Sequence, residues 1–252
     1  MKQYLYNYQT IVSFSEPVKN HAVLLRMEPY LGNYMTIDME RVIFSPGFNI
    51  KRGMDTFGNR IVYGLDRELH STLAYVSTGI VSMQPYQIKP DRLPLNIYLM
   101  DTTLTRLKAC VEFERTKDVE ADALFICDKV HQMMAYESNS TTVNTTAEEA
   151  FNAKKGVCQD FAHVMIGLCK NAEIPARYAC GFLEGTGQTH AWVEVFDGYN
   201  WIGLDPTHNK KIDYGYLKIA HGRDASDCPV SRGIYNGLID EKIQIQVTLK
   251  EL

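Results

Sequence analysis

The spacing of the hydrophobic residues changes along the chain, and this change limits the possible folds more than any other feature. In residues 4–82, alternating and β-branched segments, such as Tyr4, Tyr6 and Tyr8, are separated by turn signals. A period of two is typical of half-buried strands. Residues 119–133 instead carry hydrophobic residues at helical spacing. The sequence therefore predicts a β-rich first part and a second part that contains helices.

A cluster of prolines separates the two patterns. Pro85, Pro90 and Pro94 crowd one short stretch. Each proline removes a backbone donor and restricts the residue before it, so regular structure is not expected there. The chain has 252 residues, which is enough for two modest domains. We therefore predict a β-rich amino-terminal domain at residues 1–84 and a second domain at residues 95–252.

The second domain should contain two further helices after residues 119–133. Thr146 and Glu149 form a capping-box pattern for one of them, and Gly156 follows its expected end. The other helix should stop before Pro175. Its hydrophobic residues share one face: Cys158, Phe161, Ala162, Met165, Ile166 and Cys169.

Strand patterns follow these helices. They cover residues 177–183, 190–196 and 201–205, and Asp197-Gly198 is a turn dipeptide between the last two. Helices followed by antiparallel strands predict an α+β domain. The tail at residues 242–252 also alternates, and this strand could close an edge of either sheet.

Composition excludes several classes of function. Acidic residues outnumber basic ones by 30 to 26, and no Lys/Arg-rich run is present, so nucleic-acid binding is not predicted. Residues 1–14 lack the continuous apolar stretch of a secretory signal. No segment approaches the roughly 20 apolar residues that cross a bilayer. We therefore expect a cytoplasmic protein that does not insert into a membrane.

The chain has six cysteines and no C-x-x-C pair. This pattern predicts reduced thiols and no disulfide framework. Five of them should be small buried hydrophobes, and Cys158 differs because it falls in the first turn of a predicted helix. Backbone N–H groups and the helix dipole favour a thiolate there and can also bind an oxyanion. Taken alone, however, this position also suits a cysteine that packs against Phe161 and Met165.

A predicted hairpin brings two more reactive side chains together. If residues 197–200 form the turn, Trp192 faces Asp205, and His190 becomes a diagonal neighbour of Asp205 on the same face. Singly, the two would be interpreted as a surface histidine and a turn aspartate. Together with Cys158, they supply the nucleophile, the base and the orienting carboxylate that acyl transfer needs.

Several stretches resemble motifs of bacterial transglutaminase-like proteins, a group often described as cysteine proteases. The core motifs are GVCQDFAH at 156–163, IPARY at 174–178, THAWVEV at 189–195 and GLDPT at 203–207. Further similar stretches are LLRMEP at 24–29, DTFGN at 55–59, GRD at 222–224 and RGIYNG at 232–237. The resemblance implies a papain-like transglutaminase core, with helices packed on an antiparallel sheet, preceded by a β-rich domain. It also implies a catalytic triad of Cys158, His190 and Asp205.

Other residues near these motifs have more than one interpretation. Tyr136 and Gln159 are both candidates for a second oxyanion donor, and the sequence does not choose between them. Trp192 could shield the histidine from water or simply pack in the core. Gln188 and Thr189 stand where many relatives have smaller residues, which leaves substrate selection open.

Two further histidines favour simpler interpretations. His163 lies about 140° around the helix from Cys158, so the two do not readily chelate one metal ion. His208 could compete with His190 for Asp205, but a solvated loop histidine is the simpler interpretation. No metal and no cofactor is therefore predicted.

The sequence thus predicts a thiol-dependent amide hydrolase, a cysteine peptidase or amidase that forms a thioester with a peptide or peptide-like amide. A protein-glutamine transglutaminase is the alternative in which an amine resolves the thioester. A non-catalytic peptide-binding module of the same fold is another, and a structural metal protein is disfavoured by the Cys and His spacing. We expect hydrolysis because no calcium-loop pattern is present.

Overall fold

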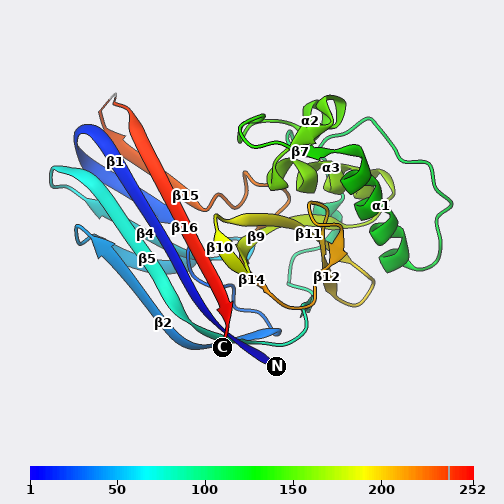
Figure 1. The fold of residues 1–252 in the computed structure, drawn as a ribbon, viewed down its shortest axis with the longest axis horizontal. Helices are drawn as coiled ribbons and strands as arrows, with labels where there is room; N and C mark the ends of the chain where they lie inside the picture. The colour runs from blue at the N-terminus through cyan, green and yellow to red at the C-terminus, as the bar shows by residue number, and fades with distance from the viewer. Residues whose placement is uncertain (238) are drawn as a thin grey trace.

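The computed structural model describes residues 1–237 and 239–252 (Figure 1). Long strands lie on one side of the molecule, and helices cover a smaller sheet on the other. The two chain termini lie next to each other. The fold is mixed α+β and β-rich, as predicted.

The larger sheet is built around one long strand. Its members are β1 (Lys2–Leu25), β2 (Met35–Ser45), β3 (Asn49–Met54), β4 (Arg60–Asp66), β5 (His70–Met83), β10 (Gly185–Gly187), β15 (Ser231–Asn236) and β16 (Glu241–Glu251). The first part of β1 pairs with β5 and β16, and its last part pairs with β4 and β15. Tyr4, Tyr6 and Tyr8 point to the buried face, as their alternation predicts.

The carboxyl-terminal tail joins this larger sheet. The sequence had left open which of the two sheets it would join. Strand β16 runs antiparallel to β1, from the Tyr4–Glu251 pair to the Phe14–Glu241 pair. Its other edge pairs with β10, which comes from the second part of the chain. The division into domains at residues 1–84 and 95–252 stays a prediction, and the segment between them contributes the two-residue strand β6 (Gln87–Ile88).

The second sheet is smaller and carries the helices. Its strand order is β13 (Lys210–Lys211), β12 (Trp201–Asp205), β11 (His190–Phe196), β9 (Ala176–Leu183) and β14 (Tyr216–Gly222), and β6 pairs with β12. The helical elements are η1 (Leu95–Tyr98), α1 (Val119–Met133), α2 (Ala147–Ala153) and α3 (Cys158–Asn171). The short strands β7 (Ala135–Tyr136) and β8 (Lys155–Gly156) pair in parallel beside α2 and α3. All pairs in the second sheet are antiparallel.

Helix α2 shows one correct expectation and one error. Thr146 Oγ1 accepts the Glu149 N–H at 3.2 Å and Glu149 Oε2 accepts the Thr146 N–H at 2.8 Å, so the capping box is confirmed. The expected stop signal is wrong, because the left-handed residue after the helix is Lys154, with φ of 54°. Gly156 lies in β8, where a Cβ atom would come within 2.6 Å of the Asp160 side chain.

Aromatic residues join the two sheets into one hydrophobic core. The ring of Phe182 in β9 stacks on Tyr6 and Tyr8 of β1, with centroids 6.1 and 5.3 Å apart. Leu249 of β16 is fully buried in the same core. The larger sheet therefore supports the face of the smaller sheet that the helices leave uncovered.

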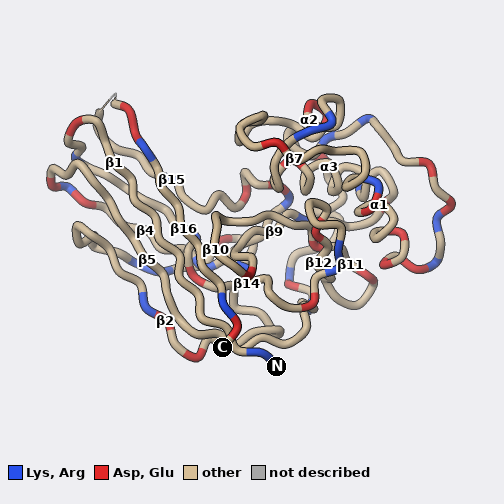
Figure 2. The backbone as a smooth tube through the Cα atoms, in the orientation of Figure 1, with Lys and Arg blue, Asp and Glu red and all other residues tan. Residues whose placement is uncertain are grey.

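The charged residues are spread along both parts of the chain (Figure 2). Lysine and arginine are interspersed with aspartate and glutamate rather than gathered in one stripe. None of the helices in the described residues combines the length and apolar character needed to span a bilayer. The cytoplasmic location stays a prediction.

Candidate active site

The start of α3 holds Cys158 in place. The carboxylate of Asp160 accepts the backbone N–H of Val157 and the hydroxyl of Thr141, each at 2.7 Å. These bonds fix the residue before the helix, so the half-buried Cys158 becomes the first helical residue. The N–H groups of a first helical turn have no acceptor inside the helix and present the positive end of its dipole. The thiol therefore lies where a negative charge is stabilised.

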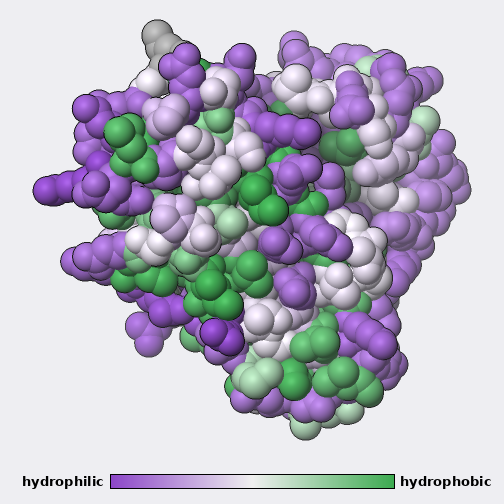
Figure 3. Space-filling model, turned by 60° about the vertical axis from the view of Figure 1, so that its left-hand side comes forward, coloured by the Kyte–Doolittle hydropathy of each residue, from purple (hydrophilic) through white to green (hydrophobic). Residues whose placement is uncertain are grey.

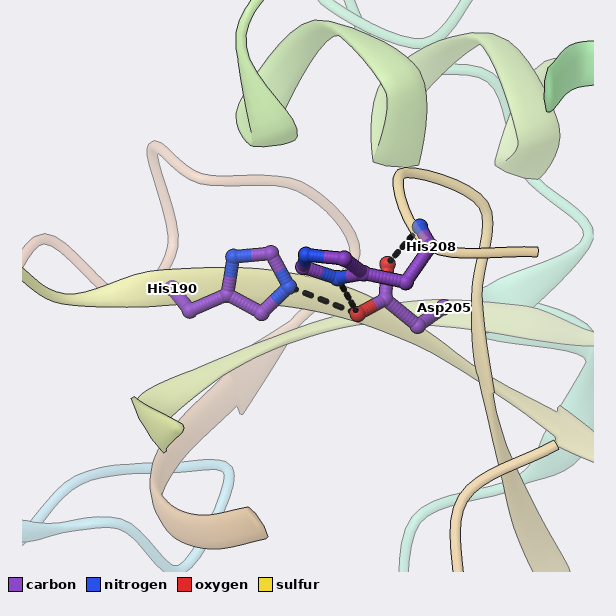
Figure 4. A group of neighbouring side chains, drawn as sticks. All are labelled: His190, Asp205 and His208. Carbon is purple, nitrogen blue, oxygen red and sulfur yellow. Dashed lines mark hydrogen bonds and ion pairs between the residues drawn. The ribbon is translucent and has the colours of Figure 1, made fainter. Parts of the chain in front are cut away.

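The hairpin of β11 and β12 has the predicted register. Phe196 pairs with Trp201 and Glu194 pairs with Gly203. His190 Nε2 consequently lies 2.7 Å from Asp205 Oδ2 (Figure 4).

Cys158 lines the same cavity as His190, and its thiol contributes to the raised pKa of the imidazole. Because Asp205 holds Nε2, Nδ1 is the ring nitrogen left for that thiol. The structure thus brings together the three residues predicted as a triad.

The protonation states follow from these contacts. Burial alone would lower the pKa of His190, but its hydrogen bond to Asp205 and the influence of the nearby Cys158 raise that pKa to about 9. Burial would raise the pKa of Asp205, yet hydrogen bonds from His190 and His208 hold it well below its usual range. At neutral pH the site therefore contains an aspartate anion and a histidine that retains its proton while it faces the thiol.

Asp205 has more partners than the sequence suggested. Its Oδ2 atom also accepts the hydroxyl of Tyr216 at 2.6 Å and lies 2.7 Å from His208 Nδ1. Oδ1 accepts the backbone N–H groups of Thr207 and His208 at 2.8 and 3.2 Å. These contacts satisfy a carboxylate whose side chain is fully buried.

His208 is not the solvated loop histidine that the sequence favoured, and the sequence did not identify Tyr216 as a partner of Asp205. The His208 side chain is 48% exposed, but its ring lies beside that of His190, with centroids 5.2 Å apart, and contacts the same Oδ2 atom of Asp205 (Figure 4). Tyr216 lies at the start of β14, which does not pair with β12. No local spacing could relate it to Asp205.

The three predicted supporting residues take different positions. Trp192 is fully buried, stacks on His190 at 6.5 Å between ring centroids, and donates its indole N–H to Tyr86 at 2.9 Å. It therefore both covers the histidine and belongs to the core. Gln159 donates its amide N–H to the carbonyl of Val143 at 3.2 Å. Tyr136 is 57% exposed, and burial and the nearby Cys158 raise its pKa.

A cavity of about 490 Å³ opens beside the thiol, and we call it the cleft. Cys158 and His190 line it, together with Tyr178 and Cys180 of β9 and the segment 225–232. Its volume is within the range of small-molecule sites. The cleft therefore has room for a substrate at the thiol.

The β-rich part of the chain fixes one wall of the cleft. The guanidinium of Arg26, just after β1, donates to the backbone carbonyls of Asp227 and Pro229 at 3.3 and 2.9 Å. The same group pairs with Asp55 at 2.8 Å. The larger sheet thus holds the segment that faces the thiol.

The other cysteines differ in accessibility. Four are buried, and one correction is needed, since Cys110 is exposed rather than buried. Burial raises the pKa of the Cys127 thiol to about 12. Cys110 is therefore the accessible thiol against which the reactivity of Cys158 can be compared.

The described residues contain one group of three ligand-type side chains that could hold a metal ion, and it overlaps the site. His190, Asp205 and His208 have ligand atoms that all lie within 4.8 Å of one another. An ion there would take the His190 nitrogen that Asp205 now binds. His163 is not part of this group, because it is buried and accepts the backbone N–H of Ala225 at 3.2 Å.

A buried ionic cluster lies behind the site, and sequence reasoning did not find it. Glu194 of β11 binds Arg177 at 2.6 Å and Lys218 at 2.8 Å, and all three side chains are fully buried. Tyr86 donates its hydroxyl to Glu194 at 2.5 Å and accepts the indole N–H of Trp192. The cluster thereby connects the core of the sheet to the tryptophan that covers His190.

Comparison with known proteins gives a family match for the middle of the chain. Residues 108–206 match the family model of the Transglutaminase-like superfamily. This region contains α1, α2, α3 and the β11–β12 hairpin, including Cys158, His190 and Asp205. The part of the chain that carries these three residues is therefore similar to the transglutaminase-like superfamily.

Three individual proteins are also similar to this chain. A crystal structure named "Putative Cysteine Protease from Cytophaga hutchinsonii" superposes with a TM-score of 0.82 and 23% identity, and the match covers 100% of this chain and 91% of that one. This likeness shows that the whole fold is shared. An uncharacterized protein of Mycobacterium tuberculosis is 28% identical over 236 residues, covering 76% of this chain and 75% of the relative. A protein-glutamine gamma-glutamyltransferase of Pseudomonas aeruginosa is 27% identical over 128 residues, which are 43% of this chain and 19% of that protein.

Proposed function

We propose that the protein is a thiol-dependent amide hydrolase that acts on a peptide or peptide-like amide. The observation that carries this proposal is one chain of contacts, from the Cys158 thiol at a helix start to His190 and from His190 to the buried Asp205. This chain of contacts opens into the cleft, where a substrate carbonyl has room. A nucleophile, a base and an orienting group in this order are the machinery of acyl transfer.

The first half of the reaction forms a thioester. The Cys158 thiolate attacks the carbonyl carbon, and the N–H groups of the first turn of α3 stabilise the resulting oxyanion. His190 then gives its Nδ1 proton to the leaving nitrogen, so that the C–N bond breaks and an amine departs. Asp205 keeps the ring oriented and stabilises the imidazolium before this transfer.

The second half releases the acid. His190 removes a proton from water, the water oxygen attacks the thioester carbon, and the C–S bond breaks. A carboxylic acid leaves, and the thiolate and the imidazolium are restored. The sum of the two halves is one amide and one water converted to one acid and one amine.

We favour water over an amine as the acceptor because of the surroundings of the site. The sequence has no calcium-loop pattern, and the segment 225–232 forms a wall that restricts the cleft. The gamma-glutamyltransferase relative supports the alternative acceptor, an amine, with the same first half-reaction. A module that only binds peptides would need neither the thiolate nor the histidine proton.

Labelling with an electrophilic peptide tests the proposal. We expect one covalent adduct, located at Cys158 by peptide mass, in the wild type and in the matched control Cys110→Ser. We expect none in Cys158→Ser. A peptide library that is bound but not cleaved, with Cys158 unlabelled, would favour the binding module.

A competition experiment tests whether water or an amine resolves the thioester. A glutamine-containing or peptide-amide substrate is offered with an excess of primary amine, and mass spectrometry measures the free acid and the amine adduct. Free acid as the main product supports the hydrolase. An adduct that dominates at modest amine concentration would instead identify a transglutaminase.

A further inference from the structure

One charged side chain outside the catalytic group faces the substrate space. Among the described residues that line the cleft, Arg232 at the start of β15 is the one arginine, and lysine, aspartate and glutamate do not occur. The rest of the lining is mostly apolar, with contributions from Leu104, Val157, Tyr178 and Val230. A single guanidinium in such a lining gives the cleft a positive local potential.

The guanidinium of Arg232 is available to a ligand. Its Nη2 atom donates to the carbonyl of Ser226 at 3.2 Å, and no carboxylate of the described residues lies within the 4.0 Å of an ion pair. Arg26, Arg177 and Arg223, by contrast, each pair with an acidic side chain. A guanidinium has five N–H donors, so most donors of Arg232 are left for a substrate.

Arg232 also borders a second hollow, which we call the groove. The groove has a volume of about 680 Å³ and lies on the larger sheet between β1, β3, β4 and β15. Its other lining residues are apolar or glycine, and three of them are well exposed: Met54, Tyr63 and Ile234, with 58%, 41% and 78% of their surface accessible. Hydrophobic side chains gather in patches among hydrophilic ones on the face of the molecule that Figure 3 shows. Arg232 lines both the cleft and the groove, so the two hollows meet at this arginine.

We propose that Arg232 selects an anionic amide as the substrate by binding a carboxylate of that molecule. This inference rests on the proposed function, because it assumes that the amide to be cleaved lies at Cys158. The planar guanidinium matches a carboxylate with two parallel hydrogen bonds, and it does so better than a lysine would. An apolar part of the same substrate then occupies the groove, which continues from the cleft on the far side of Arg232.

Two small reagents measure the charge preference without knowledge of the substrate. Iodoacetate and iodoacetamide alkylate the same sulfur, and iodoacetate carries a carboxylate. We measure the rate of iodoacetate divided by the rate of iodoacetamide at Cys158. We expect this ratio to fall by about threefold to tenfold in Arg232→Gln, the effect of losing one charged hydrogen bond. The ratio at the exposed Cys110 is an internal control, and Arg41→Gln is the matched control, since Arg41 is exposed on β2 and outside the cleft. An unchanged ratio at Cys158 would overturn the proposal.

A binding experiment tests this inference separately from the proposed function. In Cys158→Ala, calorimetry compares an uncleaved peptide amide that contains glutamate with its glutamine counterpart. We expect the glutamate peptide to bind about tenfold more tightly, this preference to disappear in Cys158→Ala/Arg232→Gln, and Arg232→Lys to restore part of it. Equal binding of the two peptides would overturn the selection of an anion even if Cys158 is a nucleophile. A preference that depends on Arg232, together with a Cys158 that no electrophile labels, would leave this inference standing and reject the hydrolase.

Discussion

The chemistry of single residues depends here on how one carboxylate is held. Asp205 accepts hydrogen bonds from Tyr216 and from two backbone N–H groups, and it contacts the rings of His190 and His208. Its buried charge is therefore compensated without protonation. The carboxylate can then keep the His190 ring in one orientation and stabilise the proton that the ring carries.

The first prediction concerns the reactivity of Cys158. With iodoacetamide at about pH 6, Cys158 should react at least about tenfold faster than Cys110, because an ordinary exposed thiol is mostly protonated at that pH. Resolving the modified peptides by mass gives both rates in one sample, so that Cys110 corrects for simple exposure. In His190→Asn the two rates should approach each other. Faster modification of Cys110 than of Cys158 in the wild type would argue against a catalytic thiolate.

The second prediction concerns the pH profile. The pKa of His190 is raised to about 9, so the imidazolium keeps its proton below that pH and loses it above. Activity should therefore fall on the alkaline side with an apparent pKa near 9. In Asp205→Asn the anion that stabilises the imidazolium is gone, so the alkaline limb of the pH profile, where activity falls, should move to lower pH. Catalytic efficiency, kcat/KM, should fall by about tenfold or more, with the roughly 10⁴-fold loss known for a serine-protease triad as an upper bound.

A control variant distinguishes orientation from charge in that experiment. Tyr216→Phe removes one donor to Asp205 and leaves the carboxylate in place, so the alkaline limb should shift less than in Asp205→Asn. Circular dichroism confirms that each variant is folded. Full activity in a folded Asp205→Asn protein would contradict the orienting role.

At the scale of elements, local sequence patterns predicted the positions of the catalytic residues better than the contacts between distant elements that surround them. The apolar face of residues 158–169 placed the thiol at the start of α3, because helical spacing is set within the helix itself. The turn at Asp197-Gly198 fixed the register of β11 against β12, and hence the contact between His190 and Asp205. Both inferences need only neighbouring residues.

Contacts between distant elements were beyond such patterns. Arg177, Glu194 and Lys218 come from β9, β11 and β14, and their pairing depends on the order of strands in the finished sheet. Arg232 reaches the cleft only because β15 pairs with β1. A single sequence carries no signal for either arrangement beyond charged residues in strand patterns.

The third prediction tests the buried cluster. Glu194→Gln leaves the buried cation of Arg177 with Asp91 as its remaining carboxylate partner, at 2.6 Å. Burial lowers the pKa of Lys218 to about 7 despite Glu194, so this lysine can lose its proton in the variant while Arg177 cannot. We expect a loss of about 3–5 kcal/mol in the free energy of unfolding, measured with urea. Asp91→Asn should cost less, since Asp91 is 18% exposed, and equal stability of Glu194→Gln and wild type would refute the role of the cluster.

The fourth prediction concerns the turn that enters α3. Gly156→Ala would place a Cβ atom 2.6 Å from the Asp160 side chain, which must then move. Asp160 would lose its bond to the Val157 N–H, and the helix start would shift with Cys158. We expect both slower alkylation of Cys158 and a stability loss of about 1–3 kcal/mol. Gly47→Ala is the matched control, because a Cβ atom there meets no neighbour within 4 Å.

At the scale of the whole molecule, the two parts are interlocked rather than joined end to end. Strand β1 pairs with β15 and β16 from the other end of the chain, and β16 also pairs with β10. Arg26 holds the cleft wall through the carbonyls of Asp227 and Pro229. The larger sheet is thus needed both for the fold and for the shape of the cleft.

This arrangement predicts that residues 95–252 do not fold when they are expressed alone. Without β1, strand β15 loses its pairing partner and β16 keeps only the three-residue β10 along one edge, so the buried residues Val247 and Leu249 become more exposed. An unpaired apolar edge strand also favours aggregation. Size-exclusion chromatography and circular dichroism of this fragment should show aggregated or unfolded material, whereas the full chain should be folded. Mixing the fragment with residues 1–94 should restore a folded complex and the fast alkylation of Cys158, and a monomeric, cooperatively unfolding fragment that already alkylates fast would show that the second part is an independent domain.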